Sequence, residues 1–292
     1  MAVIADGAET ARDVAARAHR LRPVDAVVLG YAAATSLVAL LRIGVLPRCG
    51  WVLLLNVLMA LLVLLLTRRT LGPFGGVVRE IYPLLLLPLL YSALGVLNGG
   101  GRLPVHDLLV QRWEAALFGG QPSRDWWRAD PSRLWSTVLH AAYFSYYFII
   151  AIPAGLLLAW RDRPGLRRFV LAVVATFVFC FLCFVLFPVA GPYYAFPRPD
   201  AAFLDNPAAR LVYATLARGS SYGAAFPSSH VAASVAATFS AWAASRRLGV
   251  LVAVPAALLT VGVVYCQMHY VVDALAGLAV GSGFGLAVAR RT

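Results

Sequence analysis

The feature that most constrains this chain is a series of long apolar runs separated by short polar segments. An apolar helix needs roughly 17–25 residues to cross a bilayer, and eight runs reach or approach that length. They span residues 26–46, 50–66, 81–97, 134–159, 169–189, 226–244, 248–265 and 270–289. The sequence therefore predicts an all-α fold, a polytopic membrane helix bundle with about eight transmembrane helices.

Composition excludes the competing classes of protein. Of the 292 residues, 61% are hydrophobic and 13% are charged, whereas soluble domains carry about 25% charged residues. A soluble fold of this length has nowhere to bury so much apolar surface. The net charge is +12, but the basic residues are dispersed between apolar runs, which argues against disorder and against a nucleic-acid partner. The sequence says nothing about oligomeric state.

The distribution of arginine predicts the orientation in the membrane. With a cytoplasmic N-terminus, the cytoplasmic segments hold 15 Arg and six acidic residues, and the outer segments hold ten Arg and seven acidic residues. Basic residues are enriched in cytoplasmic loops, so we expect both termini inside a bacterial plasma membrane. Residues 1–25 lack the apolar core of a signal peptide and are predicted to be a cytoplasmic tail.

Two longer stretches interrupt the apolar runs. In residues 98–133, apolar side chains recur at helical spacing, which predicts an amphipathic helix over 103–118 at the outer membrane surface. Residues 190–225 form a second outer loop, rich in Gly, Pro, Tyr and Arg. The polar side chains that are suited to catalysis follow these stretches or lie at the start of the last helices.

The first candidate motif is Phe-Pro-Ser-Ser-His, which ends at His230. Pro227 and Ser228 are typical of a helix start, which puts His230 in the first turn. Unpaired backbone N–H groups and the positive dipole end at a helix start bind anions. Ser228 and Ser229 add hydroxyl donors, so the motif predicts a phosphate-binding site.

The second candidate motif pairs His269 with Asp273 at the start of the last apolar run. The i,i+4 spacing puts both side chains on one helix face. Asp273 then accepts from one imidazole nitrogen and leaves the other nitrogen nucleophilic. Ionisable residues at membrane depth cost about 2.5–3.5 kcal/mol each and are usually functional. The pattern indicates phosphoryl transfer, in which His269 attacks phosphorus and His230 protonates the departing oxygen, with no metal or other cofactor.

Three other interpretations of these residues remain open. The triad of His230, His269 and Asp273 can be a buried polar cluster that joins helices. It can also be a metal site, although a zinc ion requires a further ligand. A serine hydrolase built on Ser229 lacks the strand–turn–helix context of that chemistry.

The two motifs resemble those of a known family. Phe-Pro-Ser-Ser-His, followed 39 residues later by His-Tyr-x-x-Asp-x-x-Ala-Gly, is similar to the second and third motifs of the type 2 phosphatidic acid phosphatase superfamily. The resemblance implies that His269 forms a phosphohistidine, Asp273 orients it and His230 is the general acid. It also implies a six-helix catalytic membrane domain within 81–292, preceded by two additional helices in 26–80.

The chain departs from the phosphatase pattern at two motifs. Arg198-Pro199 fits the end of the first motif, but Gly191 stands where that motif has Lys. Gly262 and Val263 stand where the third motif has Ser-Arg. This pattern is closest to the inositol phosphorylceramide synthase and sphingomyelin synthase-like branch, which the segment 107–122 also resembles.

The missing cations favour one reaction over another. A phosphate monoester carries nearly two negative charges because its second pKa is about 6, and a diester carries one. We therefore expect transfer of a phospho-headgroup from a membrane lipid to a lipid alcohol. The alternative is a phosphatase that uses water to release phosphate from a phosphatidic acid or polyprenyl phosphate. An alternative of another class is a non-catalytic lipid transporter or scaffold.

Further polar residues are assigned by position alone. Arg198 is the predicted phosphate ligand among the arginines, the alternative being a loop pair with Asp200. Possible headgroup contacts are Tyr193, Tyr194, Arg218 and His140. The tyrosines equally suit an interfacial aromatic belt, and His140 equally suits a packed helix contact.

Overall fold

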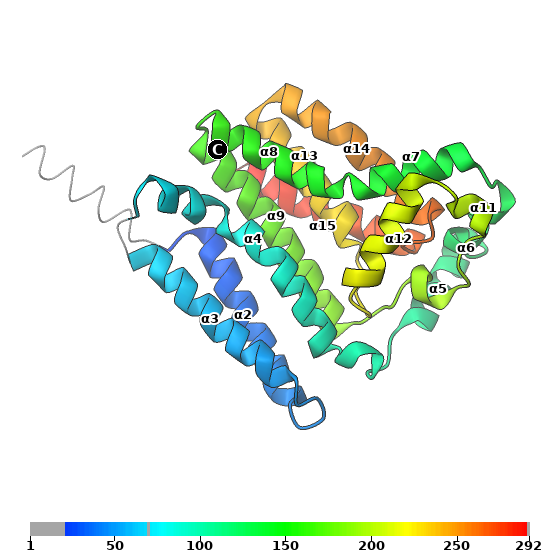
Figure 1. Ribbon diagram of the computed structural model, residues 1–292, viewed down its shortest axis with the longest axis horizontal. Helices are drawn as coiled ribbons and strands as arrows, with labels where there is room; N and C mark the ends of the chain where they lie inside the picture. The colour runs from blue at the N-terminus through cyan, green and yellow to red at the C-terminus, as the bar shows by residue number, and fades with distance from the viewer. Residues whose placement is uncertain (1–20, 69–70, 291–292) are drawn as a thin grey trace, which may run out of the picture.

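The computed structural model describes residues 21–68 and 71–290, and within them it is a bundle of α-helices without a β-strand (Figure 1). The helices are α2 (Pro23–Arg42), α3 (Cys49–Arg68), α4 (Pro73–Leu97), α5 (Asp107–Phe118), α6 (Pro122–Ala129), α7 (Arg133–Phe144), α8 (Tyr146–Ala159), α9 (Arg163–Leu186), α10 (Pro192–Ala195), α11 (Ala201–Leu204), α12 (Pro207–Gly219), α13 (Ser229–Ala244), α14 (Arg246–Tyr265) and α15 (Val271–Ala289). This confirms the predicted all-α, polytopic helix bundle.

Every predicted apolar run corresponds to a helix or a helix pair. Among the described residues, six helices are long and apolar enough to cross a membrane, namely α2, α3, α4, α9, α14 and α15. The run 134–159 is a pair, α7 and α8, bent by 43°. The run 226–244 contains α13, which has only 16 residues and falls short of a full span. Most of its side chains are covered by neighbouring helices instead of facing lipid.

The first described helix begins inside the segment that was predicted to be a cytoplasmic tail. Residues 1–20 of the predicted tail lie outside the described residues. Helix α2 begins at Pro23, so the last residues of the predicted tail are helical. Asp25 in its first turn is fully buried.

A small-residue stripe brings α13 and α15 together. Gly277, Gly281 and Gly285 recur every four residues on α15 and face the Ala-rich α13. A Cβ atom at Gly277 would lie 2.6 Å from the carbonyl oxygen of Ser228. Such spacing lets two helix backbones approach closely. The close approach sets the start of α13 beside the start of α15, and these are the two places that carry the histidine motifs.

Helices α5 and α6 lie at the end of the bundle where α15 begins, together with α11 and α12 (Figure 1). Helix α5 exposes Leu108 and Leu117, as an amphipathic surface helix does. Its acidic residues behave differently. Asp107 and Glu114 are buried against the loops beneath the helix.

The predicted outer loop 190–225 is more ordered than its composition indicates. It contains α10, α11 and the 13-residue α12. Pro192 and Pro207 occupy first-turn positions, where proline is tolerated. The Asn206 side chain accepts a hydrogen bond from the Ala209 amide and caps α12.

Candidate active site

The site forms where the starts of α13 and α15 meet. Ser228 is the N-cap of α13, and its hydroxyl accepts from the Val231 amide. The Ser228 amide donates to the backbone carbonyl of Asp273 over 2.9 Å. This tether holds the His230 and His269 rings with their centroids 5.9 Å apart at an angle of 57°. Two imidazoles at that separation can contact one phosphorus centre from two sides.

His269 lies in the short loop between α14 and α15 and is only 4% exposed. Its Nδ1 lies 3.4 Å from Oδ2 of Asp273. The same oxygen accepts from the Tyr270 amide over 2.9 Å, which fixes the carboxylate. Burial lowers the pKa of His269 to about 4, opposed by a hydrogen bond to the backbone of Ala225. The ring is therefore neutral at pH 7, and in the tautomer that donates from Nδ1 to Asp273 the lone pair of Nε2 is free.

His230 is held by aromatic rings. Its centroid lies 4.9 Å from that of Tyr143 and 4.6 Å from that of Tyr146. Nε2 lies 3.4 Å from the Tyr143 hydroxyl oxygen. Nδ1 is buried, and within the described part of the chain it has no hydrogen-bond partner. An unpaired buried nitrogen beside a helix start is available to a reacting oxygen.

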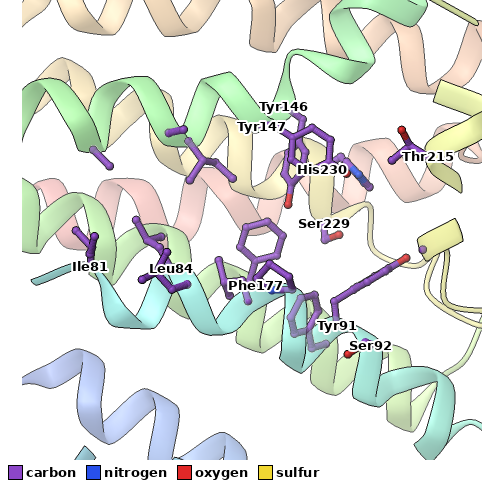
Figure 2. A pocket seen from close by; sticks show the side chains of 18 of the residues that line it. Ile81, Leu84, Tyr91, Ser92, Tyr146, Tyr147, Phe177, Thr215, Ser229 and His230 are labelled. Atoms are coloured by element: carbon purple, nitrogen blue, oxygen red, sulfur yellow. The ribbon is translucent and has the colours of Figure 1, made fainter. Parts of the chain in front are cut away.

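An apolar groove of about 660 Å³ ends at Ser229 and His230 (Figure 2). It runs between α4 and α8, and Phe177 and Phe181 of α9 line it as well. Along α4 it extends from Ile81 to Ser92, which at about 1.5 Å per residue is roughly 16 Å. Leu85 at the rim is 63% exposed, so the groove opens sideways from the bundle. Its length and its apolar lining match an acyl chain.

The structure brings together only part of the predicted set. His230, His269, Asp273, Ser228 and Ser229 gather at the two helix starts.

The predicted phosphate ligand Arg198 is directed elsewhere. It is exposed, and its guanidinium lies over the rings of Tyr193 and Tyr213. Arg218 is exposed on α12. Among the described residues, no basic side chain other than His230 lines the groove.

The remaining predicted headgroup contacts divide into two groups. The Tyr194 hydroxyl hydrogen-bonds that of Ser220, which lines the groove. His140 is fully buried in α7, where its Nδ1 hydrogen-bonds the carbonyl of Ser136. It is not among the residues that line the groove, so its environment is that of a packed helix contact.

The three positions at which this chain departs from the motifs that it resembles are closely packed. Gly191 has φ +90°, and a Cβ there would lie 2.9 Å from the Cβ of Ala225. Val263 is fully buried in the hydrophobic core. At Gly262, a Cβ would lie 2.9 Å from the carbonyl oxygen of Leu139. The low positive charge is therefore built into the backbone and packing of this site.

Sequence reasoning missed the side chains that hold the loop containing His269. Gln267 accepts from the indole N–H of Trp127 and donates to the carbonyl of Pro197. From α5, Asp107 accepts from the Tyr270 hydroxyl over 3.0 Å, and Glu114 accepts from the Val271 amide over 2.7 Å. The signal in the sequence is the spacing of Asp107 and Glu114, seven residues apart and so on one helix face.

Comparison with known proteins adds one match. The family model described as the PAP2 superfamily matches residues 110–286. That range includes both histidine motifs and most of α5, the helix that holds the loop around His269. No curated protein and no solved structure matches the chain significantly.

Proposed function

Because the chain belongs to the PAP2 superfamily, whose members act on lipid phosphates, we propose that it transfers a phospho-headgroup between membrane lipids through a phosphohistidine. One observation carries this proposal. His230, whose ring lies beside that of His269 with Asp273 behind it, lines an apolar groove long enough for an acyl chain. We also assign the chain to the inositol phosphorylceramide synthase and sphingomyelin synthase-like branch.

The reaction proceeds in two displacements. Nε2 of His269 attacks phosphorus, an N–P bond forms, and the P–O bond to the departing lipid alcohol breaks. Protonated His230 gives its proton to that oxygen. A second lipid alcohol then attacks the phosphohistidine, His230 takes the proton from its hydroxyl, and the N–P bond breaks. Atoms and charge balance without an oxidant, reductant or metal.

The electrostatics of the site favour a diester donor. The Ser228 and Ser229 hydroxyls and the first N–H groups of α13 are the phosphate donors at hand. Gly191 and Val263 exclude the two cations that a doubly charged monoester would need. A headgroup diester carries a single negative charge, which this set of neutral donors suits. Inorganic phosphate release from a monoester is the alternative.

The orientation in the membrane is part of the same proposal. The arginine bias favours cytoplasmic termini. The site then opens toward the outer face of a plasma membrane, where α5 and α12 lie at the interface.

The test uses purified protein in liposomes with two labelled substrates. The first is phosphatidylinositol carrying ³²P in its headgroup, with a fluorescent ceramide as acceptor; the second is ³²P-phosphatidic acid. We expect label to move to the ceramide and His269→Ala to abolish the transfer while the melting temperature stays within a few degrees. Thr137→Ala, a change at a half-buried position of α7 outside the groove, is the control.

Three results would overturn parts of the proposal. Phosphate release from phosphatidic acid alone would make the protein a phosphatase. Headgroup transfer that survives in His269→Ala would rule out a phosphohistidine on this residue. Lipid movement between leaflets without turnover of either substrate would favour a transporter.

A further inference from the structure

Helix α5 buries two acidic side chains against the loops of the site. The Asp107 carboxylate accepts hydrogen bonds from the backbone amides of Ala190 and Gly191, over 2.7 and 2.8 Å, and from the hydroxyl of Tyr270. Both of its oxygens are therefore used. Seven residues later, Glu114 is fully buried and points at the start of α15. One face of this surface helix is thus an acidic clamp on the segment that follows His269.

Burying the carboxylate of Glu114 costs more free energy than a purely structural contact requires. Its Oε1 accepts from the Val271 amide, but Oε2 is buried and, among the described residues, has no hydrogen-bond partner. An unsatisfied buried carboxylate oxygen costs at least about 1–3 kcal/mol. A glutamine would hold the same amide without burying a charge. A carboxylate kept here indicates a role that a neutral side chain does not fill.

The bond from Glu114 acts on the same turn that orients His269. Val271 is the first residue of α15, and its neighbour Tyr270 gives its amide to Asp273. Oδ2 of Asp273 also faces Nδ1 of His269. If the Val271 amide loses its acceptor, the first turn of α15 is free to fray, and the carboxylate that orients the imidazole moves with it.

We propose that Glu114 is a positioning residue for His269, acting through the Val271 amide and Asp273. The proposal rests on the proposed function in so far as His269 is the nucleophile. Glu114 contacts neither histidine in the described structure, so its effect falls on the geometry of attack.

The ionisation of Glu114 supplies a readout specific to this role. Burial raises the pKa of Glu114 to about 7, with smaller contributions in the same direction from the carboxylates of Asp273 on α15 and Asp125 on α6, and the Val271 amide opposes this rise. Tyr270 and Asp107 are the other titratable groups at this contact. Above pH 7 the ionised carboxylate holds the amide by a charge-assisted bond, which is stronger than a neutral one. The turnover number is therefore expected to rise as pH increases through 7.

The experiment compares Glu114→Ala and Glu114→Gln with the control Arg112→Ala, an exposed change on the same helix. Transfer from ³²P-phosphatidylinositol to ceramide is measured between pH 6 and pH 8. We expect Glu114→Ala to lower kcat about 10- to 100-fold, with KM within about twofold. Glu114→Gln should keep kcat near the wild-type value at pH 6 and lose the rise across pH 7. Equal kcat and pH profiles in all variants would overturn the proposal.

A second readout does not depend on turnover. Hydrogen exchange of the peptide covering residues 266–275 should speed up in Glu114→Ala and stay slow in Glu114→Gln and Arg112→Ala. If the wild type turns over neither lipid, the proposed function fails, and this exchange pattern still decides whether Glu114 holds the loop. Faster exchange spread over the whole bundle, with a matching loss of melting temperature, would reduce Glu114 to a structural residue.

Discussion

The two histidines of the site are distinguished by what surrounds each ring. His269 has the carboxylate of Asp273 behind Nδ1 and a hydrogen bond to the backbone of Ala225. His230 is enclosed by Tyr143 and Tyr146 and opens onto the groove. A carboxylate partner selects one tautomer and makes a nucleophile, whereas an aromatic enclosure beside bound lipid suits a proton donor. The two roles proposed for the histidines therefore rest on the neighbours of each ring, because the residue type is the same.

The pH dependence of turnover checks this assignment. Burial lowers the pKa of His269 to about 4, and only the neutral ring can attack phosphorus. The active form is therefore full above about pH 5 and is lost as pH falls through 4. We expect kcat/KM with a diester donor to collapse near pH 4. The smaller change in turnover that Glu114 causes lies at higher pH, near 7. A collapse near pH 6.5, the usual pKa of histidine, would show that the ring is solvated.

At the scale of elements, the contact between α13 and α15 determines the site. The histidines are 39 residues apart in the chain, and no local interaction brings them together. The glycine stripe does so by letting the first turn of α13 lie directly against α15. A side chain in that stripe would separate the two helix starts.

Substitution within α15 tests the stripe with an internal control. A Cβ at Gly281 would collide with the carbonyl oxygen of Ala232, whereas a Cβ at Gly283 meets nothing within 4 Å. Gly281→Ala should cost about 1–3 kcal/mol through overpacking and lower transfer activity. Gly283→Ala should leave both unchanged or raise the melting temperature slightly, since alanine favours helix. Equal melting temperatures for the two variants in detergent would contradict close packing here.

At the scale of the whole molecule, the two ends of the bundle have different roles. One end carries the histidines and the α5 clamp. The other end is held by ion pairs with buried carboxylates, in which Arg79 and Tyr82 hydrogen-bond Asp25, and Arg22 and Arg167 both hydrogen-bond Glu80. These pairs join α2 to α4 and α9. The ionic end fixes the helices that form the walls of the groove.

Removal of one partner from the ionic end should destabilise the bundle. Arg79→Ala leaves the fully buried carboxylate of Asp25 without its guanidinium, and breaking such a pair costs about 3–5 kcal/mol. Arg133→Ala removes an exposed pair with Asp205 and should cost less than about 1 kcal/mol. Thermal melting in detergent compares the two. A similarly small loss of melting temperature in both variants would mean that water reaches the carboxylate of Asp25.

The groove is tested by blocking it. Gly155 lines the groove, and a Cβ at this position would meet nothing within 4 Å. Gly155→Trp should therefore fill the groove without disturbing the bundle, and raise KM for a long-chain donor about tenfold or more. A donor with six-carbon chains should be affected little. Gly30→Trp, on an exposed face of α2, is the control. Equal loss with both donors would locate the acyl chain elsewhere.

The sequence determined the class of fold and predicted which groups react. Apolar runs longer than any soluble core element predict membrane helices, because backbone hydrogen bonds must be satisfied inside the bilayer. Local spacing predicts that His269 and Asp273 share a face. These are short-range properties, and each is carried by neighbouring residues.

Tertiary structure alone decided what stands next to the histidines. The sequence predicts Arg198 as a phosphate ligand, and only the packing shows that its guanidinium lies over the rings of Tyr193 and Tyr213. The acids of α5, a helix that the sequence predicted to lie at the membrane surface, are turned onto the loop after His269. The groove exists because α4, from outside the matched family segment, lies across from α8. Such contacts join residues far apart in the chain, and only the packing of whole helices determines which side chains meet.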